Sequence, residues 1–205
     1  MDNNKGYIDE YENLTFHPYN ILMFLILFGI CAMFLSLSAA FIYTRVQAAL
    51  PPVKLPSIFI LNTLVLMGSS YTLWQAKKMF QADDTGGYKK MILYTVILSF
   101  SFLLLQIIGW YELLGSEFFI GKDNSTSYLY LLSAVHFAHV VAGLPFLIHF
   151  LRAARKQMKD PVTVLIYFSD PAKRLNLRLL SIYWHFLDIL WVYLVVFFWV
   201  NWLVR

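Results

Sequence analysis

Apolar residues in this 205-residue chain fall in long uncharged blocks that are separated by short polar segments. A block of about 18 or more apolar residues is long enough to cross a bilayer as a helix. The pattern therefore predicts membrane helices at about 20–44, 57–76, 91–111, 127–151 and 179–204. We expect an all-α integral membrane protein in which residues 20–205 form a single bundle of five transmembrane helices.

The segments between these blocks suggest how the helices are joined. Residues 1–19 are acidic, and no small-residue cleavage signal closes the first apolar block, so they predict a cytoplasmic N-terminal tail ahead of a permanent first helix. The first two loops are short, which predicts that helices one to three pack as antiparallel neighbours. The fourth loop, 152–178, is the longest and most basic, and it contains an apolar stretch at 162–168 that we expect to rest on the membrane interface.

The basic residues indicate the orientation, because cytoplasmic loops collect Lys and Arg. Alternating loops place twelve of the sixteen Lys and Arg on one side: Lys5, Lys77, Lys78, Lys89, Lys90, Arg152, Arg155, Lys156, Lys159, Lys173, Arg174 and Arg178. The other side holds Arg45, Lys54, Lys122 and Arg205. We therefore expect the N-terminus inside and the C-terminus outside.

Composition narrows the possible functions. The chain is 60% hydrophobic and 14% charged, which leaves no room for a separate soluble catalytic domain. Its net charge of +4 follows from loop topology and predicts no nucleic-acid partner. The single Cys31 excludes an intramolecular disulfide and a cysteine-rich metal cluster. A phosphate-binding loop and a serine nucleophile elbow are also absent, so no catalytic residue is predicted.

Two predicted helices carry pairs of ionisable residues at membrane depth. Burying such side chains in a bilayer costs free energy, so they are expected to have a partner or a function there. His136 and His139 lie three residues apart in the fourth span, and His185 and Asp188 repeat that spacing in the fifth. A metal site needs three or four ligands, so we predict no metal site here. Instead we predict that His185, Asp188 and neighbouring Trp184 join His136 or His139 in a buried polar junction between the last two helices.

Weaker polar signals lie in the second and third spans. Asn62 heads a face of small and hydrogen-bonding residues that would let helices approach closely in lipid. Gln106 and Glu112 belong to a stripe along the third span. We consider all three as candidates for helix interfaces, with snorkelling to water as the alternative for Glu112.

These motifs resemble subunit III of heme-copper terminal oxidases, in the short five-helix bacterial form. The run from Tyr183 to Trp191, Tyr-Trp-His-Phe-Leu-Asp-Ile-Leu-Trp, looks like the final-helix motif of that family. The run from His136 to Gly143, His-Phe-Ala-His-Val-Val-Ala-Gly, resembles the family's His-Gly-Leu-His-Val-x-x-Gly one helix earlier. Leu61-Asn62-Thr63, Leu105-Gln106 and Tyr111-Glu112 are similar to weaker landmarks.

The resemblance implies a non-catalytic subunit that carries no heme or copper of its own. Those cofactors would sit in the partner subunits of a complex that reduces dioxygen and pumps protons, most simply a cytochrome c oxidase in the bacterial cytoplasmic (inner) membrane. The expected partners are the catalytic subunit I, other oxidase subunits and a larger respiratory supercomplex, together with membrane phospholipids. The resemblance also implies a V-shaped cleft that holds phospholipid, with Arg152 positioned like a family arginine that contacts lipid phosphate.

The chain departs from the family pattern in its polar interior. Gly29 to Ala32 contain no acid where the family commonly has one, and Gly109 stands where a second glutamate is frequent. These departures favour a scaffold over a proton carrier. Two alternatives stay open: a subunit of a ubiquinol oxidase or nitric oxide reductase assembly, and a stand-alone proton-coupled transporter that uses Glu112, His139 and Asp188.

Overall fold

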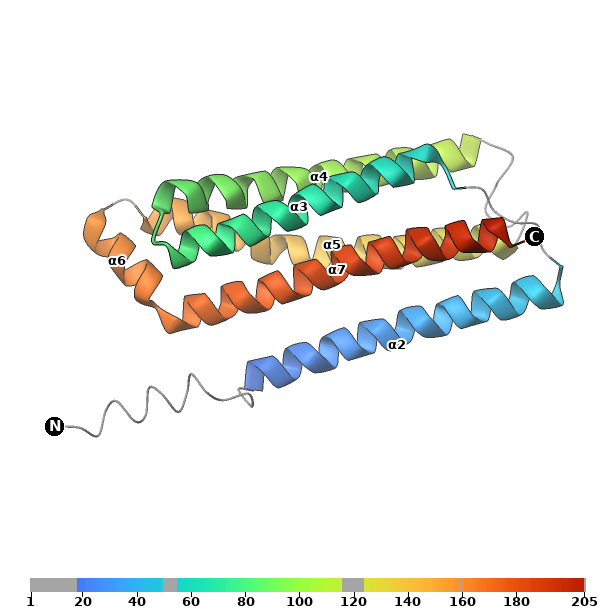
Figure 1. Cartoon of the computed structure of the whole chain (residues 1–205), viewed down its shortest axis with the longest axis horizontal. Helices are drawn as coiled ribbons and strands as arrows, with labels where there is room; N and C mark the ends of the chain where they lie inside the picture. Colours follow the sequence, from blue (N-terminus) through green and yellow to red (C-terminus); the bar gives the residue numbers. More distant parts are fainter. Residues whose placement is uncertain (1–17, 50–54, 116–123, 159, 205) are drawn as a thin grey trace.

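The computed structural model describes residues 18–49, 55–115, 124–158 and 160–204. It contains five long helices and one short one, drawn in Figure 1: α2 (Pro18–Gln47), α3 (Ser57–Gln81), α4 (Thr85–Gly115), α5 (Asn124–Gln157), α6 (Pro161–Ser169) and α7 (Pro171–Leu203). The predicted tail, 1–19, lies outside the described residues except for Pro18 and Tyr19.

All five long helices are long and apolar enough to cross a membrane, and the described residues contain no strand. The predicted fold class is confirmed. The helices extend beyond the predicted apolar spans; α7, for example, begins at Pro171, eight residues before the predicted start at 179. Helical hydrogen bonding continues into charged residues, whereas a hydropathy pattern ends at the first of them.

The α3–α4 pair is the most extensive helix contact in the bundle. Its tight turn explains the antiparallel packing: Asp83 adopts a positive φ of 54°, which Asp tolerates better than most residues. The Asp84 carboxylate then accepts a hydrogen bond from the Gly87 backbone N–H at 3.0 Å and caps the first turn of α4. The turn therefore fixes the two helices side by side.

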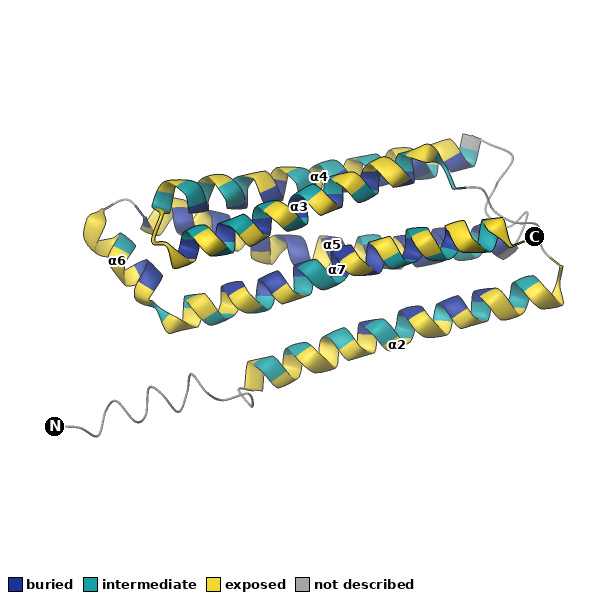
Figure 2. Cartoon of the chain, in the orientation of Figure 1, coloured by how far each residue is buried: buried dark blue, intermediate teal, exposed yellow. Residues whose placement is uncertain are grey.

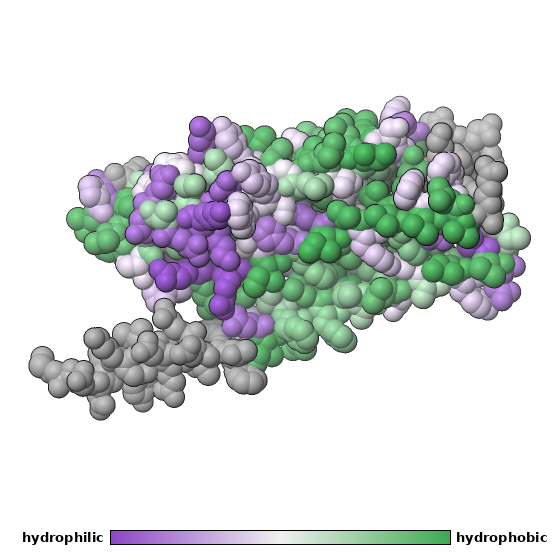
Figure 3. Space-filling model, viewed as in Figure 1, coloured by the Kyte–Doolittle hydropathy of each residue, from purple (hydrophilic) through white to green (hydrophobic). Residues whose placement is uncertain are grey.

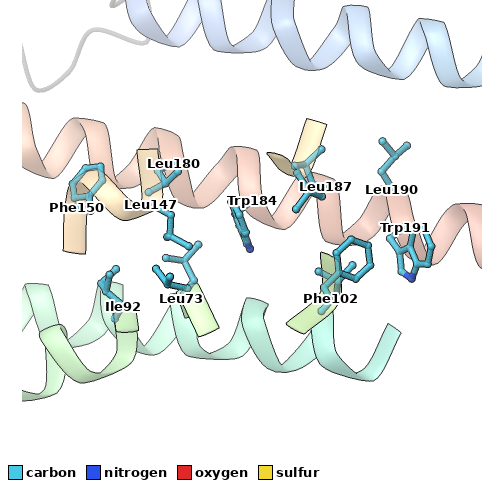
Figure 4. Close-up of a cluster of buried hydrophobic side chains, with 14 of the residues drawn as sticks. Leu73, Ile92, Phe102, Leu147, Phe150, Leu180, Trp184, Leu187, Leu190 and Trp191 are labelled. Carbon is cyan, nitrogen blue, oxygen red and sulfur yellow. The ribbon is translucent and has the colours of Figure 1, made fainter. Parts of the chain in front are cut away.

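Four helices, α3, α4, α5 and α7, surround the main core. Figure 4 shows Trp184 and Trp191 pointing from α7 towards α3, with Leu73, Ile92 and Phe102 across from them. Both tryptophans are about 1% exposed, so α7 contributes the largest buried side chains. Close packing, more than hydrophobicity, holds such helices together in lipid.

The prediction that α2 packs beside α3 was wrong. Among the described residues, α2 packs on α5 and α7. Phe41 contacts the rings of Tyr128, Phe197 and Phe198, and the Tyr193 hydroxyl donates to Ser38 at 2.9 Å. A short loop limits the distance between two helices but does not choose which neighbour a helix packs against, and the aromatic side chains of α5 and α7 offer α2 the larger contact.

Contacts between α2 and the bundle gather in its second half. In its first half every residue from Pro18 to Gly29 is exposed or half-buried, which Figure 2 shows as a mainly yellow helix start, and Asn20 Oδ1 accepts a hydrogen bond from Arg178 of α7 at 2.9 Å. The far end is tied by Arg45, whose guanidinium donates to the backbone oxygen and Oδ1 of Asn201 and to the backbone oxygen of Val204. The guanidinium thereby satisfies carbonyls at the end of α7 that the helix leaves free.

Basic residues collect at one end of the bundle, where α3 and α5 end and α4 and α7 begin. Figure 3 shows this as a purple zone at one end, while green apolar surface covers much of the remaining length. The short helix α6 lies at the same end and runs steeply across the direction of the long helices (Figure 1). The sequence pattern gave this segment only as an apolar stretch in a loop; the structure shows that it is helical.

Candidate functional site

Three hydrogen bonds join α3 to α7 across the middle of the bundle, and we call their six residues the polar seam. The indole N–H of Trp191 donates to Thr63 Oγ1 at 3.2 Å, and that of Trp184 donates to Ser69 Oγ at 3.1 Å. Ser70 Oγ lies 2.5 Å from His185 Nδ1. The two tryptophans are seven residues apart and their acceptors, Thr63 and Ser69, are six apart, so the two antiparallel helices are joined at two levels about two turns apart.

Asp188 lies on α7 between the two tryptophans and is 7% exposed. Its carboxyl group is beside the Ser70 hydroxyl, and its Oδ2 has no hydrogen-bond partner among the described residues. His185 and Asp188 thus meet α3, not α5 as the predicted junction required. The helical spacing places Trp184, Asp188 and Trp191 on one stripe, but it does not tell which neighbouring helix that stripe faces.

His136 is fully buried and contacts α7 through an aromatic side chain. Its ring centre lies 5.1 Å from that of Trp191 and 5.8 Å from that of Phe102 on α4. Neither ring nitrogen has a hydrogen-bond partner among the described residues. His136 therefore packs as a flat ring between α4 and α7, and it forms no hydrogen bond with His185 or Asp188.

His139 is half-buried and serves a different contact. Its Nδ1 lies 2.7 Å from the backbone oxygen of Val135, so Nδ1 carries the proton in this arrangement. Its ring packs beside Phe34 of α2, with ring centres 6.1 Å apart. The Tyr183 hydroxyl of α7 donates to the His139 backbone oxygen at 3.0 Å. The two histidines thus help to connect α5 to α4, α2 and α7.

The other polar candidates divide between core and surface. Asn62 Nδ2 donates to Gln106 Oε1 at 2.9 Å, and both residues are about 1% exposed, so this pair joins α3 to α4. Glu112 is exposed near the end of α4. Gly109 is buried, and a Cβ there would meet the Ile58 side chain at 2.9 Å, which explains sterically why a longer side chain does not fit at this position.

A groove opens where the first half of α2 diverges from α5 and α7. Its volume is about 690 Å³, and its walls are mostly apolar, with Met23 and Ile26 on α2 facing Phe146 on α5 and Leu180 on α7. Polar side chains line it at the basic end: His149, Asp170, Lys173 and Asn176. Arg152, the predicted lipid contact, is exposed on α5 and is not part of this lining.

Sequence reasoning missed the acceptors on α3 and the basic residue of the groove. Ser69 and Ser70 were interpreted as part of a small packing face, although Thr63 and Ser69 lie about two turns apart, as do the two tryptophans that bond to them. Lys173 was counted only for topology. The described residues contain no group of three or more His, Cys, Asp or Glu side chains arranged to hold a metal ion.

Comparison with known proteins agrees with these motifs. The sequence profile of the family "Cytochrome c oxidase subunit III" matches residues 13–202. A cytochrome c oxidase subunit 3 from Synechocystis is 25% identical over 189 residues, covering 88% of this chain and 75% of the relative. The subunit 3 of Loxodonta africana is 29% identical over 152 residues, covering 73% of this chain and 52% of the relative.

A probable cytochrome c oxidase subunit 3 from Rickettsia prowazekii is 29% identical over 147 residues, covering 71% of this chain and 48% of that protein. The match thus spans about half the length of the Loxodonta and Rickettsia relatives and three quarters of the Synechocystis one. Because the profile covers nearly the whole chain, this protein belongs to the cytochrome c oxidase subunit III family.

Proposed function

We propose that this chain is a structural, lipid-binding subunit III of a respiratory heme-copper oxidase, most simply a cytochrome c oxidase. Heme and copper would lie in its partner subunits, including the catalytic subunit I, and this chain would contribute no catalytic residue. The setting would be a bacterial inner membrane. The complex as a whole would reduce dioxygen and translocate protons.

The observation that carries this proposal is how the buried and half-buried polar side chains of α3 are used. Thr63, Ser69 and Ser70 bond to α7, and Asn62 bonds to Gln106 on α4. A transporter of the size of this chain would need polar groups arranged along a path, whereas these groups are paired between adjacent helices. Such pairing suits a scaffold that other subunits pack against.

The groove supports the lipid-binding part of the proposal. Its apolar walls suit an acyl chain, and Lys173 offers an ammonium group for a phosphate at the basic end. Lys173 also donates to Gln157 Oε1 at 2.5 Å and lies over the Tyr167 ring at 4.0 Å, so its position is held from two sides. A lipid in this groove would fill the space between α2 and the rest of the bundle.

The test of the subunit assignment is purification of the tagged chain from its native membrane in mild detergent. We expect co-purification of heme- and copper-containing subunits, a reduced-minus-oxidised heme spectrum, and oxygen consumption with reduced cytochrome c. Oxygen consumption with ubiquinol alone would assign the complex to the quinol alternative. Recovery of the chain without heme proteins, together with proton flux in liposomes made from it, would contradict the proposal in favour of a transporter.

The groove is tested by filling it. Ala142 lines the groove, whereas Ala138 is exposed one turn earlier on α5 and does not line it. We expect Ala142→Phe to reduce the phospholipid that stays bound to the purified complex, measured by mass spectrometry, and Ala138→Phe to leave it unchanged. Equal lipid retention by both variants would argue against this groove as a lipid site.

A further inference from the structure

The short helix α6 exposes an apolar stripe that the proposed function does not use. Val162, Leu165 and Ile166 are 69%, 71% and 62% exposed. Their spacing of three and four residues places them on one face of the helix. In Figure 3 green atoms appear at this end of the molecule beside the purple basic zone. A contiguous exposed apolar face next to charged residues is typical of an interaction surface.

The opposite face of α6 is firmly packed. Tyr167 and Phe168 are buried, and the Phe168 ring lies 5.1 Å from Phe80 and 6.2 Å from Tyr88, at the adjoining ends of α3 and α4. Burial raises the pKa of the Tyr167 hydroxyl above its usual value, so the ring stays neutral under the Lys173 ammonium. The inner face therefore fixes which side of α6 points outward.

Both ends of α6 are joined to membrane helices by short connections. At its start the Asp160 backbone N–H donates to Thr163 Oγ1 at 3.3 Å, and α5 ends only a few residues earlier. At its end Asp170 links directly to α7, where its Oδ1 accepts a hydrogen bond from the Ala172 N–H at 2.9 Å. Because α5 ends and α7 begins where these helices emerge from the membrane, α6 is held near the membrane surface.

The charges around α6 identify the kind of surface that it fits. Arg155 and Lys156 lie in the last turn of α5, and Lys173 and Arg174 in the first turns of α7. The nearby acids of the connecting segments are Asp83, Asp160 and Asp170; Asp83 and Asp160 line a hollow beside Leu165, and Asp170 is engaged as a helix cap. Basic residues beside an exposed apolar stripe match the boundary between lipid headgroups and acyl chains.

We propose that α6 is an interfacial helix that lies in the headgroup layer of the leaflet at the basic end. Its apolar stripe enters the acyl boundary, and phosphates of anionic phospholipids pair with Arg155, Lys156 and Arg174, whereas Lys173 belongs to the groove. This surface is separate from the groove at α2. The test of α6 is therefore independent of the groove test, and either proposal can fail without the other.

The test places a photoreactive diazirine amino acid at Leu165 in the chain, within the complex in its native membrane. A matched control carries it at Gln81, which is an exposed polar residue at the same end of α3. After irradiation, the chain is recovered from the assembled complex and analysed by mass spectrometry. We expect phospholipid adducts at position 165 and none, or several-fold fewer, at position 81.

A second labelled position controls for any effect of the diazirine side chain on the structure around Leu165. Ile166 belongs to the same stripe, so the diazirine at 166 should also yield lipid adducts, and absence of lipid adducts at both 165 and 166 would overturn the proposal. Adducts to another polypeptide at either position would do the same, because they would show a protein interface. The charge component is tested by Arg155→Gln combined with Lys156→Gln, which should lower the anionic share of the lipid adducts; an unchanged share would overturn that component.

Discussion

Gly143 lets α5 lie against the aromatic face of α7. A Cβ at this position would meet Tyr183 Cε1 at 2.8 Å and Trp184 Cζ3 at 3.0 Å, whereas one at Gly29 would meet nothing within 4 Å. We predict that Gly143→Ala destabilises the bundle by about 1–3 kcal/mol through overpacking. Gly29→Ala should be neutral or slightly stabilising, since Ala favours helix more than Gly. The purified complex of each variant is denatured, and the loss of this chain from it is monitored. Equal denaturation midpoints for Gly143→Ala and Gly29→Ala would contradict the steric argument.

Asp188 offers a sharper test of the polar seam because two substitutions separate shape from hydrogen bonding. Asp188→Asn keeps the side-chain size and a polar group beside Ser70, so we expect the complex to retain this chain. Asp188→Ala removes both, and we expect a looser complex with a shorter turnover lifetime. Subunit content and the decay of oxygen consumption during turnover are the measurements. Full content and an unchanged lifetime in Asp188→Ala would show that the carboxyl group has no such role.

The hydrogen bonds between α3 and α7 each rely on one hydroxyl group of α3, so single substitutions can test this helix pair. Ser70 bonds to His185 across the seam, whereas Ser36 bonds only to the Ala32 carbonyl of its own helix. We predict that Ser70→Ala weakens α3–α7 association by about 0.6–2 kcal/mol, the range for interhelical hydrogen bonds in membranes. Ser36→Ala should have no such effect. Thermal release of the chain from the complex distinguishes the two, and matching release temperatures would count against the seam.

The end of α7 is a second contact between elements, and it relies on the geometry of one guanidinium. Arg45 reaches both Asn201 and Val204, which a fork of N–H donors can do and a single ammonium cannot. We therefore expect Arg45→Lys to release α2 nearly as readily as Arg45→Gln. Cysteines placed at Ser38 and Tyr193, joined by a bis-maleimide cross-linker long enough to replace the tyrosine ring, would report this as a lower cross-linking yield in an otherwise cysteine-free chain. A high yield in Arg45→Lys with a low one in Arg45→Gln would indicate that charge alone suffices.

For the molecule as a whole, hydropathy predicted the membrane helices because length and apolarity decide whether a segment spans. It did not predict the partners of α2, since a helix that is apolar on all sides offers no periodicity to orient it. The seam was hard to foresee for a related reason: the motif around His185 and Asp188 fixes a stripe, and only packing decides whether α3 or α5 meets it. Nine-residue α6 was too short to stand out from its basic loop.

The attachment of α2 by its second half also affects how this sequence can drift over evolution. Phe34, Ser38, Phe41 and Arg45 each have a specific partner on α5 or α7, so shape and hydrogen bonding restrict what can replace them. Asn20 accepts a hydrogen bond from Arg178 of α7, but from Ile21 to Gly29 the described contacts restrict the side chains mainly to being apolar. Neutral substitutions should therefore accumulate in the first half of this helix, while the second half changes only together with its partners.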